Sequence, residues 1–129
     1  MATRSTIQLQ NTVGVIEQTV TLYKHWDGYP SNVIPLIELA VKNANVNPRN
    51  GRYTSNVLAE LIKLDNEICI TKSHEVHGDT EYQYNLKGKN LEIKQYDYIE
   101  GNYIIITNNV VEVALWEHKY SFTKNGIKI

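Results

Sequence analysis

One stretch of the sequence marks where the N-terminal strands end and the first helix begins: Tyr23-Lys24-His25-Trp26-Asp27-Gly28-Tyr29-Pro30. Residues 15–24 are rich in β-branched and aromatic types, which favour a strand that ends at Tyr23-Lys24-His25. Asp27-Gly28 is typical of a turn, because Asp tolerates unusual dihedrals and Gly takes a positive φ without steric cost. The stretch therefore predicts a sharp change of direction at the end of a strand.

The residues after this turn predict a helix. Pro30 holds the preceding Tyr29 in an extended conformation, and Ser31 or Asn32 has the side chain of a helix N-cap. The result is a strand-to-helix corner that carries polar and aromatic groups. Loops on a rigid scaffold present such groups to solvent, so a corner of this kind is typical of binding sites.

Six residues around this corner are candidates for binding a ligand or a partner. An antiparallel hairpin brings the start of its first strand beside the end of its second, which predicts that Arg4 contacts Asp27. That contact would be either a surface ion pair worth under about 1 kcal/mol or part of an anion-binding site. The candidates are Arg4, Tyr23, His25, Trp26, Asp27 and Tyr29.

The same residues also have a purely structural interpretation. Trp26 can belong to the core with its N–H satisfied locally. Asp27 can serve only to cap the turn, and His25 can bond a backbone carbonyl. Exposure of the indole and imidazole favours recognition, whereas burial of both favours the structural interpretation.

Length, net charge and cysteine content limit the classes of protein to which this chain can belong. At 129 residues the chain is expected to form a single domain, residues 1–129. Its net charge of −1 argues against broad nucleic-acid binding. Cys69 is the only cysteine, which excludes an intramolecular disulfide and suits a reducing cytosol. The sequence shows no secretory signal and no apolar run that could cross a bilayer, so we expect a cytoplasmic protein without a membrane partner.

The stretch belongs to a predicted N-terminal β-hairpin. Residues 3–10 alternate apolar and polar side chains, which predicts a half-buried strand. Residues 11–14 are expected to form the turn, and residues 15–25 the returning strand.

Two helices are predicted in the middle of the chain. Apolar residues spaced i, i+3, i+4 and i+7 within residues 33–44 form one buried face, and Pro35 fits only if that helix begins just before it. The second helix has Thr54 or Ser55 as its N-cap and an apolar stripe within residues 57–62. Because neither helix can shield its own stripe, both are expected to pack on one face of a sheet.

From Glu67 onward the apolar period changes to two, which predicts strands. Lys87-Gly88-Lys89-Asn90 and Asn108-Asn109 are expected to form hairpin turns. Sequential hairpins imply an antiparallel meander. The predicted fold class is therefore α+β, with an N-terminal β-hairpin, two α-helices packed on one sheet face and then an antiparallel β-meander. Strands are expected within residues 67–71, 82–86, 91–95, 103–107, 110–116 and 119–129.

Three segments resemble a family of small proteins common in bacteriophages, prophages and other mobile elements: Thr3-Arg4-Ser5-Thr6-Ile7, residues 23–31 and Glu81-Tyr82-Gln83-Tyr84. Members typically combine a Thr-Arg-Ser-like strand, a Tyr-x-His-(Trp or Ser)-Asp-Gly-Tyr-Pro motif and a Glu-Tyr-x-Tyr strand. Asn32-Val33-Ile34-Pro35 stands where the family usually has a glycine-rich stretch. The resemblance implies a phage-like origin and a place in the host cytoplasm, but no particular reaction.

Two groups of residues could carry chemistry. In the first, the carboxylate of Asp27 could orient the imidazole of His25 for general-base work. The second is the run His74-Glu75-Val76-His77-Gly78-Asp79, whose spacing resembles metal-ligand clusters. A hairpin loop explains this run better, because a strand would send His74 and His77 to opposite faces. Since no nucleophile, phosphate-loop or dinucleotide motif is present, we expect no catalytic residue, no metal and no cofactor.

Three hypotheses for function follow from these features. The first is a non-enzymatic phage-type accessory protein that inhibits a bacterial defence system, by binding a host protein complex or by sequestering a nucleotide signal. The second is a small hydrolase or nuclease that uses His25 and Asp27. The third is an oligomeric structural accessory protein without a ligand. A homodimer is compatible with the first and third hypotheses.

Overall fold

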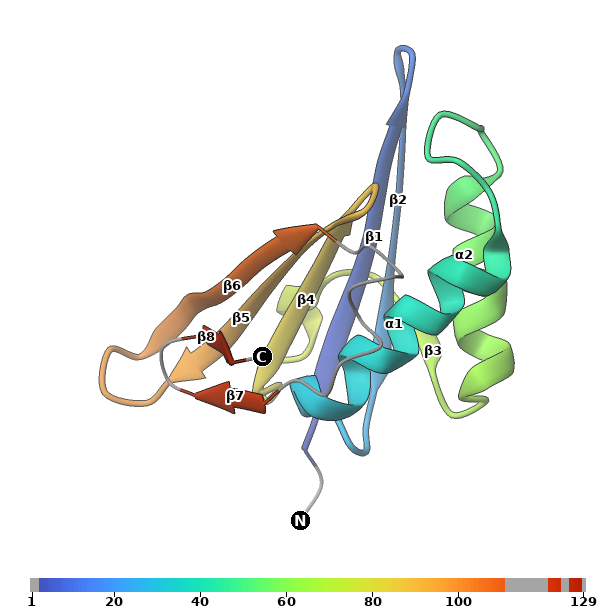
Figure 1. Cartoon of the computed structure of the whole chain (residues 1–129). Coiled ribbons are helices and arrows are strands. Elements are labelled where there is room, and N and C mark those ends of the chain that lie inside the picture. The colour runs from blue at the N-terminus through green and yellow to red at the C-terminus, as the bar shows by residue number, and fades with distance from the viewer. Residues whose placement is uncertain (1–2, 111–120, 124–125, 129) are drawn as a thin grey trace.

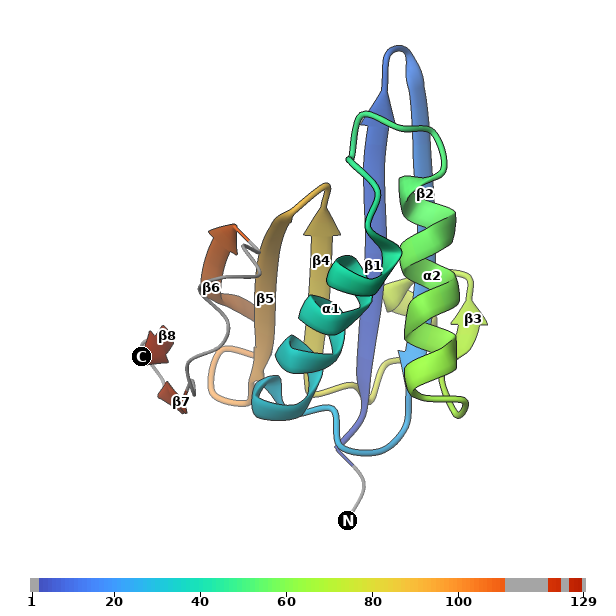
Figure 2. The same cartoon turned by 45° about the vertical axis from the view of Figure 1, so that its right-hand side comes forward.

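The structure, a computed structural model, describes residues 3–110, 121–123 and 126–128. These residues form a six-stranded sheet of order β3-β2-β1-β4-β5-β6 and a separate two-stranded sheet of β7 and β8. Both helices lie on the same side of the larger sheet (Figure 1, Figure 2). In chain order the elements are β1 (Ser5–Val13), β2 (Ile16–Lys24), α1 (Pro30–Ala44), α2 (Tyr53–Leu64), β3 (Cys69–Thr71), the 3-10 helix η1 (His74–Val76), β4 (Tyr82–Lys87), β5 (Asn90–Asp97), β6 (Asn102–Val110), β7 (Ser121–Thr123) and β8 (Gly126–Lys128).

The predicted fold class, α+β, is confirmed, but the larger sheet is mixed. β4, β5 and β6 form the expected antiparallel meander, whereas β4 pairs with β1 in parallel. β4 therefore lies next to the first strand of the chain, while β3 forms the opposite edge beside β2. The segment that connects β3 to β4, residues 72–81, passes behind the strands, on the face away from the helices (Figure 1).

The N-terminal hairpin has a shorter turn than predicted. Residues 11–13 continue β1, and Gly14 and Val15 alone form the turn. Gly14 has a φ of 61°. A two-residue hairpin loop needs such positive φ values, so the glycine sets the turn and the polar residues before it stay in the ladder.

α1 begins at Pro30, earlier than predicted. Neither Ser31 nor Asn32 caps it; the N-cap position is Tyr29, which is extended at φ −64° and ψ 146° and has no side-chain cap hydrogen bond. Proline suits the first helical position, because its missing N–H would have no partner there. Pro35 consequently lies inside the helix, where it removes one internal backbone hydrogen bond.

α2 begins at Tyr53, so the predicted caps Thr54 and Ser55 lie inside it. The N-cap position is Arg52, again without a side-chain cap hydrogen bond. The hydroxyl of buried Tyr53 donates to the carbonyl of Gly88 at 2.7 Å, and burial raises the pKa of Tyr53 to about 12. This contact fastens the start of α2 to the β4–β5 hairpin. Among the described residues, no helix is long and apolar enough to span a membrane.

The core lies between the helices and the sheet face they cover. The apolar period is two along the strands and near 3.6 along the helices, as predicted. Ile70 departs from the pattern: it is 62% exposed, because β3 is a three-residue strand at the sheet edge. The largest fully buried side chains are Tyr84, Ile7, Leu9, Leu22, Ile34, Ile37, Leu61, Leu86, Leu91, Ile93, Val33 and Val57.

The C-terminal predictions are met only in part. Asn108-Asn109 lies inside β6 and pairs with β5, so it is not a turn. Most of the strand predicted at residues 110–116 lies outside the described residues. Within the predicted last strand, residues 119–129, two short strands pair with each other as β7 and β8.

Candidate functional site

The corner between β2 and α1 lies at the surface. Trp26 is 52% exposed and Tyr29 is 46% exposed. Asp27 is also exposed, and Tyr23 and His25 are half-buried. The indole is therefore accessible to a partner rather than part of the core.

Gly28 fixes the position of this corner. Its N–H donates to the carbonyl of Thr3 at 2.9 Å, and its own carbonyl accepts a hydrogen bond from the hydroxyl of buried Tyr84 at 2.6 Å. The positive φ expected at the glycine belongs instead to Asp27, at 53°. Glycine is needed at position 28 because the chain passes close to the start of β1.

A continuous set of contacts, here called the corner network, connects Thr71, His77, Tyr23, His25 and Trp26. The hydroxyl of Tyr23 is 2.9 Å from Nδ1 of His25. The His25 ring meets the Trp26 ring edge to face, with ring centroids 4.8 Å apart. On its other side Tyr23 stacks on His77 at 4.1 Å, and Nε2 of His77 is 2.7 Å from the Thr71 hydroxyl. These contacts hold the side chains in defined orientations.

Arg4 does not form the predicted ion pair with Asp27. Its guanidinium lies 2.9 Å from the carboxylate of Asp79, because residues 72–81 carry that carboxylate across the sheet. Burial and the Asp79 charge raise the pKa of Tyr23, while the charge and hydrogen bonding of Arg4 act in the opposite direction. Arg4 thus adjoins the corner network through Tyr23.

Besides Arg4, two further candidate residues are not part of this network. Tyr29 faces Tyr82 instead, with ring centroids 6.3 Å apart. Within the residues that the structure describes, no hydrogen bond or ion pair connects Asp27 to His25 or Arg4. The carboxylate therefore does not orient the imidazole, and the proposed general-base pair is not formed.

The run from His74 to Asp79 is neither a hairpin loop nor a metal cluster. His74 is buried, with Nδ1 hydrogen-bonded to the Thr6 hydroxyl and Nε2 2.8 Å from Oδ1 of Asn85. Burial lowers the pKa of His74, against smaller opposing effects of the Asn85 hydrogen bond and Glu75. No group of three or more potential metal ligands occurs in the described parts of the chain.

Sequence reasoning missed the contributions of Thr71, His77 and Asp79 to the site. The dense run of titratable residues at 74–79 was a signal, but the sequence does not place it beside the corner. Only the crossing of residues 72–81 over the sheet brings Tyr23 and His77 together. What the arrangement offers chemically is an aromatic and imidazole surface bordered by an ion pair.

Comparison of the chain with protein families, with curated proteins and with solved structures finds no match. An assignment of function therefore depends on the geometry of the site and on the motif resemblance.

Proposed function

We propose that this protein is a non-enzymatic binding protein that recognises a partner protein through the corner network. The observation that carries the proposal is Trp26, a half-exposed indole held edge to face by His25. Tryptophan is among the residues that contribute most to protein–protein affinity. Because His25 is itself fixed by Tyr23, little side-chain entropy is lost when a partner covers the indole.

The motif resemblance suggests the biological setting. A small phage-type protein with a preformed recognition surface suits an inhibitor that binds a bacterial defence complex in the host cytoplasm. We therefore propose inhibition of such a complex as the role of the binding.

A nucleotide signal is the less favoured ligand. A nucleotide needs cationic or N–H donors for its phosphates, yet the guanidinium of Arg4 is already paired with Asp79. The exposed carboxylate of Asp27 would add further repulsion. These charges support a protein as the partner.

A hydrolase is also less favoured. General-base catalysis by His25 needs an orienting partner and a nearby nucleophile or water. Nδ1 of His25 is directed to the hydroxyl of Tyr23, a weak acid whose pKa burial raises further. The geometry therefore supports a positioning role for His25, with Trp26 as the group it positions.

Replacement of Trp26 tests the proposal. The protein is produced in a panel of bacterial strains, each with one defence system, and phage plating efficiency is measured. Wild type should restore plating in at least one strain, and Trp26→Ala should abolish the effect, because loss of a central indole costs about 2 kcal/mol or more of binding energy.

The matched control is Ile16→Ala, which removes a similarly exposed apolar side chain at the far end of β2. It should leave plating unchanged, and circular dichroism should show that both variants are folded. Full activity of Trp26→Ala, or equal loss in both variants, would contradict recognition at the corner. If folded wild-type protein restores plating in none of the strains, the defence role is wrong.

A further inference from the structure

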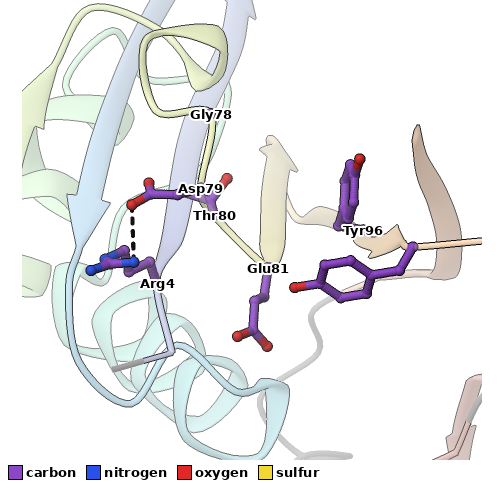
Figure 3. Close-up of a pocket in the computed structure, with 7 residues that line it drawn as sticks. Arg4, Gly78, Asp79, Thr80, Glu81 and Tyr96 are labelled. Carbon is purple, nitrogen blue, oxygen red and sulfur yellow. Dashed lines mark ion pairs between the residues drawn. The ribbon is translucent and has the colours of Figure 1, made fainter. Parts of the chain in front are cut away.

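A cleft of about 510 Å³ adjoins the corner network at Arg4. One side of it is formed by Arg4 and Asp79, whose ion pair is drawn in Figure 3. Tyr96 and Tyr98 also line the cleft, and Figure 3 shows Tyr96 on the far side of it from the ion pair. Figure 3 shows the carboxylate of Glu81 between the ion pair and Tyr96. The cleft therefore combines aromatic rings with a carboxylate.

The aromatic side of the cleft is held in place by its neighbours. Tyr96 meets Tyr98 and Tyr103 edge to face, with ring centroids 5.0 Å and 5.2 Å away. The hydroxyl of Tyr103 lies 2.8 Å from the hydroxyl of Thr80. Thr80 is buried near the end of residues 72–81, here called the crossing segment. Tyr98 is 77% exposed, so its ring is accessible to a ligand.

Glu81 is fixed by its backbone rather than by its side chain. Its N–H donates to the carbonyl of Arg4, and its carbonyl accepts from the N–H of Tyr96, both at 2.9 Å. Within the described residues its carboxylate has no hydrogen-bond or ion-pair partner. Since Arg4 and Asp79 neutralise each other, Glu81 leaves the lining with a net negative charge.

We propose that this cleft binds a guanidinium group, presented as an arginine side chain by the partner protein of the proposed function. A cation over the face of a tyrosine is attracted by the ring quadrupole. The planar guanidinium can stack on a tyrosine while its N–H groups donate to the Glu81 carboxylate. An anionic group would meet Glu81 and Asp79 with Arg4 already paired. This inference rests on the proposed function only for the source of the arginine. The chemistry by which the cleft would bind a guanidinium group is independent of that function.

Titration with a small probe tests the cleft directly. Nα-acetyl-arginine amide is added to ¹⁵N-labelled full-length protein, and amide chemical shifts are followed. We expect saturable shifts at Gly78, Thr80 and Glu81 with a dissociation constant in the millimolar range. Nα-acetyl-citrulline amide has the same shape without the charge and should bind at least about threefold more weakly. Equal binding of citrulline would overturn the proposal.

A charge-removing variant identifies the carboxylate. Glu81→Gln should weaken binding of the arginine probe about threefold to tenfold, whereas Glu67→Gln, at an exposed site outside the cleft, should not. Unchanged affinity in Glu81→Gln would overturn the assignment. If the lysine analogue binds better than arginine, the guanidinium class is wrong.

The two proposals fail independently. If the arginine probe does not bind but Trp26→Ala still abolishes plating, the cleft assignment falls and the corner remains the recognition surface. If the probe binds as expected but Trp26→Ala keeps full activity, the cleft stands as a guanidinium site and the proposed function falls.

Discussion

Gly28 is the residue on which the position of the recognition corner depends most directly. A Cβ at this position would lie 2.6 Å from the carbonyl oxygen of Thr3 and 2.8 Å from the hydroxyl of Ser5. Neither neighbour can give way easily, since one is backbone and Ser5 is fully buried. Any side chain here must push the corner away from β1 and weaken the Tyr84 hydrogen bond to the Gly28 carbonyl.

We therefore expect Gly28→Ala to lower the free energy of unfolding by about 1–3 kcal/mol, the usual cost of overpacking. Urea unfolding followed by far-ultraviolet circular dichroism measures it. Gly51→Ala is the matched control, because a Cβ there meets no atom of the described residues within 4 Å, and its effect should stay within about 0.5 kcal/mol. A Gly28→Ala protein as stable as wild type would show that the close approach to Thr3 is not retained in solution.

Residue types predicted which side chains gather at the corner, but not which of them contact each other. Asp27-Gly28 does not form a hydrogen-bonded turn: the chain bends at Trp26 and Tyr29 on either side of it, and the positive φ falls on the aspartate. His25 follows the last residue of β2, Lys24, yet its ring still lies on the side of Tyr23 that the period of two predicts, within hydrogen-bond distance of the Tyr23 hydroxyl. The Arg4–Asp27 pair was wrong because a segment far away in sequence supplies a closer carboxylate, Asp79.

At the scale of elements, the crossing segment of residues 72–81 is what completes the site. His74, which belongs to this segment, attaches the segment to the sheet through hydrogen bonds of its ring to Thr6 on β1 and to Asn85 on β4. The amide nitrogen of Asn85 is directed to Glu92 at 3.4 Å, so its oxygen faces His74. Nε2 of His74 must then carry the proton, and Nδ1 accepts from the Thr6 hydroxyl. This arrangement needs a neutral imidazole.

Stability should therefore depend on pH through His74. Burial lowers its pKa in the folded protein below the ordinary value of 6.5, so between these two pKa values the unfolded chain binds more protons. The contribution of neutral His74 is complete above about pH 6.5 and is lost as the pH falls toward the folded-state pKa. Urea unfolding at intervals from about pH 7.5 to pH 5 should show a falling free energy of unfolding.

The variant His74→Gln is the control for this titration, because it has no group that ionises at this position. It should be less stable at neutral pH, but its stability should vary less between pH values than that of wild type. An identical slope in the two proteins would assign the titration to other groups. Glu75 and Lys94, which act on His74 with opposite signs, stay unchanged in the variant.

Periodicity identified both helices and most strands, because the period reflects which face is buried. It did not find the helix starts. The caps expected at Ser31 or Asn32 and at Thr54 or Ser55 are absent, since Pro30 and Tyr53 begin the helices. At Tyr53 the reason is a tertiary contact, the hydrogen bond to Gly88, which no local pattern contains.

For the whole molecule, the parallel pairing of β1 with β4 is the feature that sequence reasoning did not supply. Hairpins can be read locally, because a turn signal joins two alternating segments. A parallel pair joins segments that are far apart in the chain; between these two lie β2, α1, α2, β3 and η1. Neither strand carries a signal for its partner. The positions of His77 and Asp79 could not be predicted for the same reason, because both residues lie in the segment that leads into β4.

The same topology makes the centre of the sheet its most protected part. Consecutive strand residues face opposite sides, and Ser5, Thr6 and Ile7 are all fully buried. Residues 84–86 of β4 are likewise buried in succession. Both faces are covered there, by the helices on one side and by the crossing segment on the other. β3, in contrast, has two exposed residues and, among the strands that the structure describes, a single partner.

Hydrogen exchange should reproduce this order. Amides in the first half of β1 and in β4 should exchange only on global unfolding, whereas those of β3 should exchange through local opening and at least about tenfold faster. Exchange measured by mass spectrometry on the full chain at neutral pH provides the test. His74→Gln should speed exchange in residues 72–81 before it affects β1, because it loosens the crossing segment first. Equal protection of β3 and β4 would contradict this picture, since an edge strand is protected to that degree only when a further strand or a second copy of the chain covers it.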